Sequence, residues 1–450
     1  MNLRRSTAWP ACVVTGLAVF LCGLDHLVLL TALTAIRSDF GPAADAGASW
    51  FVNAYLVPVA VLPPLAARFA ARFGRLRLFT AALVVFTAGS LTAACSDTVT
   101  SLTVARAVQG TGAALITPLS LALVAAAVPA RRRPVLLGIW GALGGLAVAV
   151  GPVVGGAVVQ WGGWRSVFLI NVPLGCLLAV AAPVLLREPA GPDAAVPAPA
   201  VERPATGWLR KRQRSRGWLR NRPSRNLLAV HACGFLMHAC VFGTVFWLAQ
   251  FPQTVQGHSP WEAGLRILPW TAMPLLVAPV AGLVMSRTGP RPVLVTAFAL
   301  TMVSSVWFAL VLRPEAGFTG QLPGLVAGGV GMALFFTAAP EALLAAAPPA
   351  RGLSASGLNT SVREVGALAG VALSAVLFAR HGSLTDPASF THGLAAVLWG
   401  GTAVAGAGLL TATLTGPARP HKAPDPPAPR KPAQRRVPQC REPAAAHPAH

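Results

Sequence analysis

Ionisable side chains inside the long apolar segments of this chain of 450 residues are the first candidates for chemistry. The main candidates are Asp25, Arg106, Arg363 and Glu364; His26 is interpreted as a packing or pore-lining residue, with a proton relay as the alternative. A charged residue at the centre of a membrane-spanning helix costs about 2.5–3.5 kcal/mol on insertion scales, so such residues usually have a function. A buried carboxylate beside a movable cation can bind a proton when the cation leaves and lose it when the cation returns. The residue types therefore point to proton coupling.

Asp25 and Arg106 are predicted to form an ion pair. Under the topology given below, both residues lie about 8–14 Å from the outer ends of their helices, at a rise of about 1.5 Å per residue. A carboxylate and a guanidinium at the same depth of one helical bundle can offset each other's desolvation. A structural ion pair without any part in coupling is the alternative interpretation.

Arg363 and Glu364 are adjacent, so their side chains point about 100° apart on a helix. Glu364 is either a second site for a proton or a cationic substrate, or one member of a polar cluster with Asn359. The sequence contains no Walker loop, no His-Glu-x-x-His and no Gly-x-Ser-x-Gly motif, the patterns of ATP-driven, metal-dependent and esterase chemistry. We therefore expect no cofactor, no metal site and no enzymatic activity.

The elements that must hold these residues are membrane-spanning helices. The chain is 54% hydrophobic and 11% charged, whereas soluble proteins have about 25% charged residues. Apolar runs of about 20 residues are long enough to cross a bilayer. The predicted spans are residues 11–33, 48–67, 78–95, 101–128, 135–160, 166–186, 226–250, 263–285, 292–312, 319–347, 353–379 and 390–414. The sequence thus predicts an all-α polytopic membrane protein with twelve spans.

The net charge of +22 is distributed in a way that indicates topology rather than nucleic-acid binding. Basic residues gather before the first span, at 68–77, at 131–133, at 187–225 and in the C-terminal tail. This alternation follows the positive-inside rule and predicts that both termini are cytoplasmic. The basic surface then faces anionic lipid headgroups. The Ala-, Arg- and Pro-rich composition is typical of a high-GC genome, so we expect the cytoplasmic membrane of a bacterium.

The order of the spans predicts four regions. Two sets of six spans, at 1–187 and 226–416, indicate two helical bundles related by an internal repeat. A basic cytoplasmic linker at 188–225 separates them, since its Pro, Ala and Arg content cannot build a core. A Pro- and Arg-rich cytoplasmic tail at 417–450 is predicted to be disordered.

A glycine-rich stretch at 144–156 lies within the fifth span. Ala147, Gly151 and Gly155 recur every four residues, so they line one stripe of a helix on which another helix can pack closely. A generic packing helix is one interpretation; a hinge-like contact with the second bundle is the other. The stretch resembles the "antiporter" motif of proton-coupled exporters in the major facilitator superfamily. The residues of the motif are Gly145, Gly151, Pro152, Gly155 and Gly156.

Further motifs carry the same resemblance. Residues 102–114, which include Arg106, resemble the fourth-helix motif Arg-x-x-Gln-Gly-x-Gly-x-Ala. The surroundings of Asp25 resemble the first-helix motif of the fourteen-helix drug:proton antiporter branch, and residues 164–173 and 352–366 also resemble that branch. That branch has two extra helices between its bundles, whereas this chain has the polar linker. We therefore expect a twelve-helix member.

A loop motif occurs at equivalent places in both halves of the chain and resembles the signature loop of the superfamily. Its residues are Arg72, Gly74 and Arg75 in the first copy and Arg287 and Gly289 in the second. Ala71 and Ser286 stand where the family has an aspartate. In that family the aspartate is thought to help lock one conformation, and this chain lacks it in both copies of the loop.

The resemblance implies a fold and a function. The fold is the major facilitator fold, two six-helix bundles related by a pseudo-twofold axis. The implied function is proton-coupled export of lipophilic compounds that are cationic or neutral, by alternating access. The expected partners are a small lipophilic substrate, protons and membrane lipids, and the expected oligomeric state is a monomer. The alternatives are a dedicated exporter of one metabolite or self-made antibiotic, and a non-transporting membrane sensor.

Overall fold

In a computed structural model, residues 3–127, 133–186, 225–347 and 352–416 are described, and these residues form helices and short connections without any strand. The prediction of an all-α chain is confirmed. The predicted linker lies outside the described residues except for Arg225, which begins a helix instead of ending the linker. The predicted tail at 417–450 also lies outside them.

The helices fall into two groups along the chain. The first group comprises α1 (Leu3–Phe40), α2 (Pro42–Val61), α3 (Pro63–Phe73), α4 (Arg75–Ala94), α5 (Val99–Ala127), α6 (Arg133–Gly162), α7 (Ser166–Leu169) and α8 (Asn171–Leu185). The second comprises α10 (Arg225–Leu248), α11 (Phe251–Thr254), α12 (Pro260–Thr271), α13 (Met273–Thr288), α14 (Pro290–Val311), α15 (Phe318–Ala346), α16 (Gly352–His381) and α17 (Pro387–Thr413). Within the described residues, 11 helices or joined helix pairs are long and apolar enough to span a membrane, or 12 if the bent α2–α3 pair is one span.

The second predicted span, 48–67, is bent. It falls on α2 and α3, which meet at Leu62 with a bend of 60°. Pro63 and Pro64 follow the bend. Proline has no backbone N–H to donate and its ring clashes with the preceding turn, so two prolines in sequence interrupt the helical ladder.

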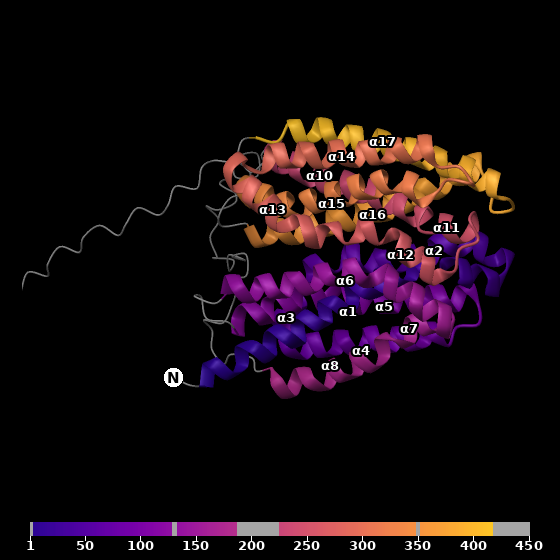
Figure 1. The fold of residues 1–450 in the computed structure, drawn as a ribbon. Helices are drawn as coiled ribbons and strands as arrows, with labels where there is room; N and C mark the ends of the chain where they lie inside the picture. The colour runs from indigo at the N-terminus through magenta and orange to yellow at the C-terminus, as the bar shows by residue number, and fades with distance from the viewer. Residues whose placement is uncertain (1–2, 128–132, 187–224, 348–351, 417–450) are drawn as a thin grey trace, which may run out of the picture. The chain divides into compact units, whose positions relative to one another are not determined.

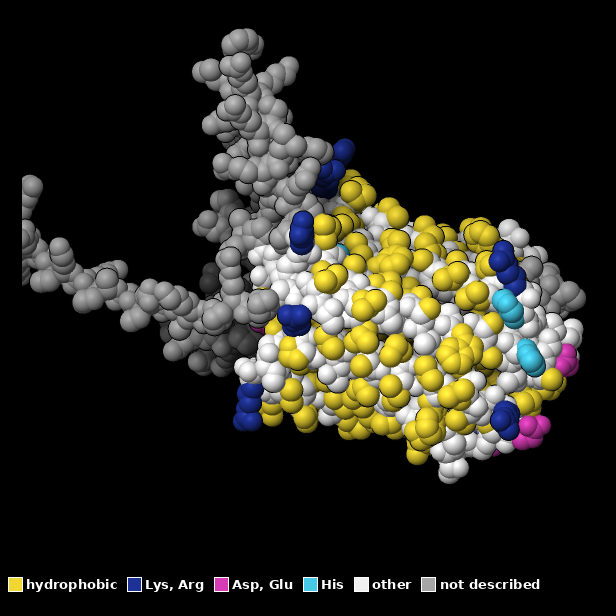
Figure 2. Space-filling model, turned by 90° about the horizontal axis from the view of Figure 1, so that it is seen from above, with side chains coloured by type: hydrophobic (Ala, Val, Ile, Leu, Met, Phe, Trp, Pro, Cys, Tyr) yellow, Lys and Arg dark blue, Asp and Glu magenta, His cyan; other side chains and the backbone are white. Residues whose placement is uncertain are grey.

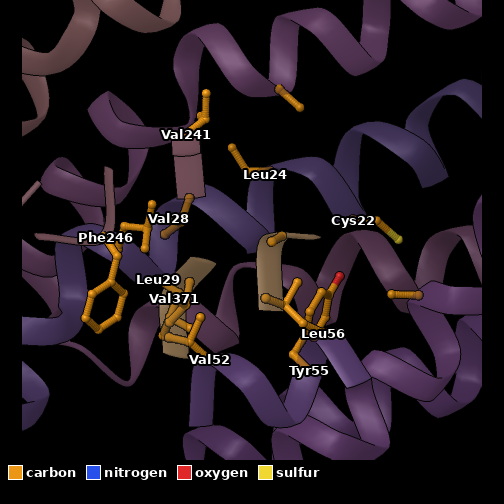
Figure 3. Packing of buried hydrophobic residues seen from close by; sticks show 14 of the residues in the cluster. Cys22, Leu24, Val28, Leu29, Val52, Tyr55, Leu56, Val241, Phe246 and Val371 are labelled. Atoms are coloured by element: carbon orange, nitrogen blue, oxygen red, sulfur yellow. The ribbon is translucent and has the colours of Figure 1, made fainter. Parts of the chain in front are cut away.

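The two groups of helices form two bundles, with α1–α8 on one side and α10–α17 on the other in Figure 1. The bundles meet mainly where α6 lies against α12 and where α2 lies against α16. Figure 3 shows buried side chains from both bundles in one cluster, with Val28 of α1 and Val52 of α2 near Val241 of α10 and Val371 of α16. The hydrophobic core therefore runs continuously from one bundle into the other.

The outer surface is apolar where a soluble protein would be polar. On the face formed by α14 and α17, charged side chains gather at the two ends of the helices, and an apolar band lies between them (Figure 2). Leu310 of α14 is 63% exposed and Leu410 of α17 is 69% exposed. A continuous apolar surface of this kind is the surface that faces lipid. The chain is therefore a multi-pass membrane protein.

The two loop glycines adopt the same unusual backbone conformation. Gly74 ends α3 with φ of 86°, and Gly289 ends α13 with φ of 79°. Residues with a side chain rarely adopt positive φ, so both turns require glycine. The matching turns support an internal duplication. Arg72 and Arg287, two residues before the glycines, are both exposed.

The small-residue stripe of α6 packs inside its own bundle, which corrects the expectation of a contact with the second bundle. A Cβ on Gly151 would lie 2.8 Å from Cβ of Leu27, and one on Gly155 would lie 2.9 Å from Cα of Val28, both in α1. Ala147 similarly lies against Gly23 of α1. Residues four apart share one helix face, and that face is occupied by α1.

Gly156 faces the second bundle, because it lies about 100° around the helix from Gly155. A Cβ there would collide with the backbone carbonyl of Pro260 in α12, and a Cβ on Gly264 of α12 would collide with the carbonyl of Pro152. The contact between α6 and α12 is therefore reciprocal and made backbone to backbone.

Polar contacts also join the bundles near this point. Arg37 Nη1 donates to Gln250 Oε1, and Gln253 Nε2 donates to the Thr31 carbonyl over 3.1 Å. Thr271 Oγ1 donates to the Ala149 carbonyl over 3.0 Å. The first two bonds hold the bundles together at the end where α1 ends, and the third lies deeper, at the middle of α6.

The substitution Gly156→Val should separate α6 from α12. Overpacking a close contact costs about 1–3 kcal/mol, so we expect the purified protein to have a lower apparent melting temperature in detergent. Gly145→Val is the matched control, since a Cβ on Gly145 of the same helix meets nothing within 4 Å. An equal loss of stability in both variants would contradict the assigned contact.

Candidate functional site

Asp25 and Arg106 form a buried ion pair in the first bundle. Arg106 Nη1 of α5 lies 2.7 Å from Asp25 Oδ2 of α1, and the two side chains are 1% and 0% exposed. The structure therefore brings together the two residues whose pairing the sequence predicts. A buried pair is stable only if hydrogen bonds satisfy the remaining polar atoms, so the neighbours of the pair decide its properties.

The carboxylate accepts hydrogen bonds from three residues. Besides the bond from Arg106, Oδ1 of Asp25 accepts from Gln109 Nε2 over 2.8 Å and from Asn171 Nδ2 over 2.7 Å. Gln109 and Asn171 also donate to Ser90 Oγ, each over 3.1 Å. Four helices, α1, α4, α5 and α8, thus contribute to one buried network. Hydrogen bonds to a carboxylate favour its ionised form.

Local sequence explains how these side chains meet. Arg106 and Gln109 are three residues apart on α5, so they share a face, and Arg106 Nη1 also donates to Gln109 Oε1 over 2.7 Å. A Cβ on Gly89 of α4 would lie 2.6 Å from the backbone nitrogen of Gln109. Because Gly89 has no side chain, α4 approaches α5 closely enough for Ser90 to reach Gln109.

Aromatic rings surround the guanidinium of Arg106. Its carbon Cζ lies 4.2 Å from the ring centroid of Tyr55 and 5.7 Å from that of Phe168. A cation over an aromatic face is attracted by the ring's electron density. Arg106 Nε is buried without a hydrogen-bond partner. The described contacts of the cation are thus those with Asp25, Gln109 and two rings.

His26 links the first bundle to the second by ring contacts. Its ring centroid lies 5.8 Å from that of Tyr55 and 5.1 Å from that of Phe242 in α10. This placement agrees with the interpretation that His26 packs or lines a pore. It also places a titratable ring between the two bundles.

The second predicted cluster is arranged differently from the prediction. Asn359 does not bond to Glu364; its Oδ1 lies 3.2 Å from Nδ1 of His231. Arg363 Nε donates to His238 Nε2 over 2.9 Å. Asn359 and Arg363 are four residues apart and share a face of α16, whereas Glu364 is rotated away from that face.

Sequence reasoning missed several residues of these networks. His231 and His238 are seven residues apart in an apolar helix, so their two-turn spacing is a usable signal for a shared face. Gln109 and Asn171 lie inside the family-like motifs, but their direct contact with Asp25 is not visible there. Ser90 gives no signal, since serines in apolar helices often bond their own backbone.

The comparison with known families decides the class of protein. Residues 15–314 match the model of the Major Facilitator Superfamily. The chain belongs to this superfamily. Members of the superfamily are transporters, so this protein is a transporter and not an enzyme.

Two relatives of this superfamily member illustrate its similarity to exporters. It is 29% identical over 415 residues to "Multidrug resistance protein Stp" of Mycobacterium tuberculosis, covering 83% of this chain and 77% of the relative. It is 30% identical over 414 residues to the "Tetracenomycin C resistance and export protein" of Streptomyces glaucescens, again covering 83% and 77%.

Solved structures support the major facilitator fold of the transporter. A D-xylose-proton symporter matches with a TM-score of 0.74 and 16% identity, covering 92% of this chain and 99% of the other. A bacterial homologue of the human lysosomal transporter Spinster matches with a TM-score of 0.71 and 15% identity, covering 92% and 97%. The predicted fold class is confirmed.

The substitution Gln109→Leu should destabilise the transporter. It removes a hydrogen bond to each member of the ion pair, and a hydrogen bond to a charged group contributes about 1.5–3 kcal/mol. We expect a clear fall in apparent melting temperature in detergent. Thr111→Val is the control on the same helix, because the Thr111 hydroxyl bonds to the Ala107 carbonyl of its own helix. A loss no larger than that of the control would show that the network is not stabilising.

Proposed function

We propose that this transporter exports lipophilic drugs or antibiotics across the cytoplasmic membrane in exchange for protons. The names of its relatives support export of such compounds. The observation that carries proton coupling is the buried pair of Asp25 and Arg106, which lie 2.7 Å apart. A carboxylate that depends on a single cation changes the stability of its surroundings when it takes up a proton.

Protonation of Asp25 would disturb the network in a defined way. It removes the counter-ion of Arg106 and leaves a cation buried among apolar and aromatic groups. Breaking a buried ion pair by loss of one partner costs about 3–5 kcal/mol. The helices that carry the pair, α1 and α5, would therefore shift to let Arg106 find another partner or water. This shift couples proton binding to movement of the first bundle.

The proposed movement is a rocking of the two bundles, taken as the domains 1–187 and 226–416. The contacts between α6 and α12 and between α2 and α16 would act as pivots. With both termini cytoplasmic, the end joined by Arg37 and Gln250 is the outer end. Asp25 is inaccessible in this state, so the proton would enter from outside after that end opens.

The remaining elements have proposed supporting roles. Arg72, Arg75 and Arg287 would face the anionic inner surface of the membrane from the glycine turns, with the transporter acting as a monomer. Ala71 and Ser286 stand at the two positions where the family's loop has a carboxylate. We infer that the inward end is latched without these charges.

A dedicated exporter of one self-made antibiotic is the second candidate function. It is favoured by the similarity to proteins named for resistance to single antibiotics, among them "Methylenomycin A resistance protein" of Streptomyces coelicolor, which is 28% identical over 388 residues. Transport of one compound out of a broad panel would support it.

Export should be measurable as dye accumulation. In a pump-deleted bacterial host that expresses the chain, we expect lower accumulation of at least one dye from a panel of ethidium, rhodamine 6G and fluorescein, and recovery on addition of a protonophore. Reduced accumulation that a protonophore does not reverse would contradict proton coupling.

Asp25→Asn should abolish transport driven by a pH gradient in proteoliposomes while the protein remains folded in the membrane. The amide cannot take up a proton, so we expect uptake to fall at least about tenfold, to the level of empty vesicles. Asp39→Asn is the control on the same helix, since Asp39 is 45% exposed and bonds to Arg165. Normal coupled transport by Asp25→Asn would contradict the proposed mechanism.

A further inference from the structure

We propose that Arg363 binds the negative charge of the transported compound, and that the substrates are flat aromatic molecules with a carboxylate or an ionised phenol. This inference rests on the proposed export function and names its substrate class. It differs from the expectation of cationic or neutral substrates drawn from the sequence. The argument starts from the hydrogen bonds around Arg363.

His238 fixes one edge of the guanidinium. Nδ1 of His238 lies 2.9 Å from the Gly234 carbonyl oxygen, which can only accept, so Nδ1 carries a hydrogen. In the neutral ring, Nε2 is then the acceptor, and it receives the Nε–H of Arg363 over 2.9 Å. Both partners of His238 thus require the same tautomer. His238 thus orients the side chain of Arg363 without supplying a negative charge.

Arg363 has no carboxylate partner within the part of the chain that the structure describes. Glu364 is adjacent, yet the two side chains form no ion pair within 4.0 Å, because they leave the helix about 100° apart. Among the described residues, Nη1 and Nη2 of Arg363 have no hydrogen-bond acceptor, and the side chain is partly exposed. A guanidinium with two donor groups open presents a fork that matches a carboxylate.

The depth of Arg363 makes an unpaired cation costly. It lies 11 residues from the first residue of α16, Gly352, which corresponds to about 16 Å along a helix. A charge at this depth is expensive unless it is paired. An anionic ligand that enters with its charge would therefore gain from pairing there, whereas a cationic ligand would be repelled.

Aromatic rings form the surroundings of the guanidinium. Cζ of Arg363 lies 5.0 Å from the ring centroid of Phe336. His238 stacks on Phe242 at 5.8 Å and meets the edge of Phe335 at 6.0 Å. Phe242 in turn contacts His26 of the first bundle, so these rings lie where the bundles meet. Flat faces beside a cation favour a planar aromatic molecule with an anionic group.

Glu364 is the group that opposes this assignment. Its carboxylate, on the same helix, would repel an anion near Arg363 and attract a cation. His26 of α1 also faces this site through Phe242, and His231 of α10 faces it through Asn359. Arg363→Gln and Glu364→Gln therefore form a matched pair of variants. The first removes a positive charge and the second removes a negative charge.

The test uses two dyes with the same xanthene ring system and opposite charge. Fluorescein is an anion and rhodamine 6G is a cation at mildly alkaline pH. The purified full-length transporter is placed in nanodiscs of phosphatidylcholine, which offer no anionic lipid headgroup as an alternative occupant. Binding of each dye is measured by fluorescence anisotropy, and folding of each variant by its melting temperature.

We expect the wild-type protein to bind fluorescein more tightly than rhodamine 6G. Arg363→Gln should weaken fluorescein binding about 10- to 100-fold, the range for a hydrogen bond to a charged group, and leave rhodamine binding within about twofold. Glu364→Gln should strengthen fluorescein binding. His238→Phe, which keeps a ring but removes the acceptor, should weaken fluorescein binding less than Arg363→Gln does and leave rhodamine 6G unaffected. Arg363→Lys retains the charge and should keep the preference for the anion, which preserves the test if the glutamine variant does not fold.

Several outcomes would overturn the inference. They are preference of the wild type for rhodamine 6G, binding of neither dye, and equal loss of both dyes or of neither in Arg363→Gln. Arg363-dependent fluorescein binding without transport driven by a pH gradient would refute the export function and leave the anion site standing. Transport without Arg363-dependent selectivity would refute the anion site and leave the export function standing.

Discussion

The first bundle is organised around the need to keep Arg106 neutralised in an apolar environment. An unpaired guanidinium at that depth would cost more than most single interactions in the protein can offset. Asp25 supplies the charge, Gln109 bonds to both partners, and Ser90 and Asn171 complete the network from two further helices. The relative positions of α1, α4, α5 and α8 are therefore set by polar contacts, although almost every other contact between them is apolar.

Arg106 and Arg363, one in each bundle, have different kinds of partner. Arg106 is enclosed with a carboxylate, whereas Arg363 is oriented by a neutral histidine and has no described carboxylate partner. Ring contacts connect the two sites through Tyr55, His26, Phe242 and His238. A change at one arginine can thus be felt at the other through packed rings, without any need for a direct charge interaction.

Much of the fold could be predicted, because long apolar runs and alternating loop charge are direct consequences of a bilayer. Pro63 and Pro64 also encode the bend at Leu62. Hydropathy averaged over the length of a span does not show such a bend. The hydrogen-bond partners of Asp25 were harder to predict, because neutral amides and hydroxyls in apolar helices have many possible acceptors. The directions of Gly155 and Gly156 could not be predicted, since small residues leave the choice of neighbour to the helices around them.

The contacts that close the outer end have an energetic consequence. The hydrogen bonds of Arg37 and Gln253 contribute about 0.5–1.5 kcal/mol each, so together they stabilise the closed outer end by about 1–3 kcal/mol. At Gly156 and Gly264, α6 and α12 meet through bare backbone, so no side chain has to be withdrawn at these two points when the bundles part. Two conformations separated by a few kcal/mol are both populated, the minor one at about 0.1–10%. The protein thus sits near a balance point, where gain or loss of one buried charge is enough to exchange the major and minor populations.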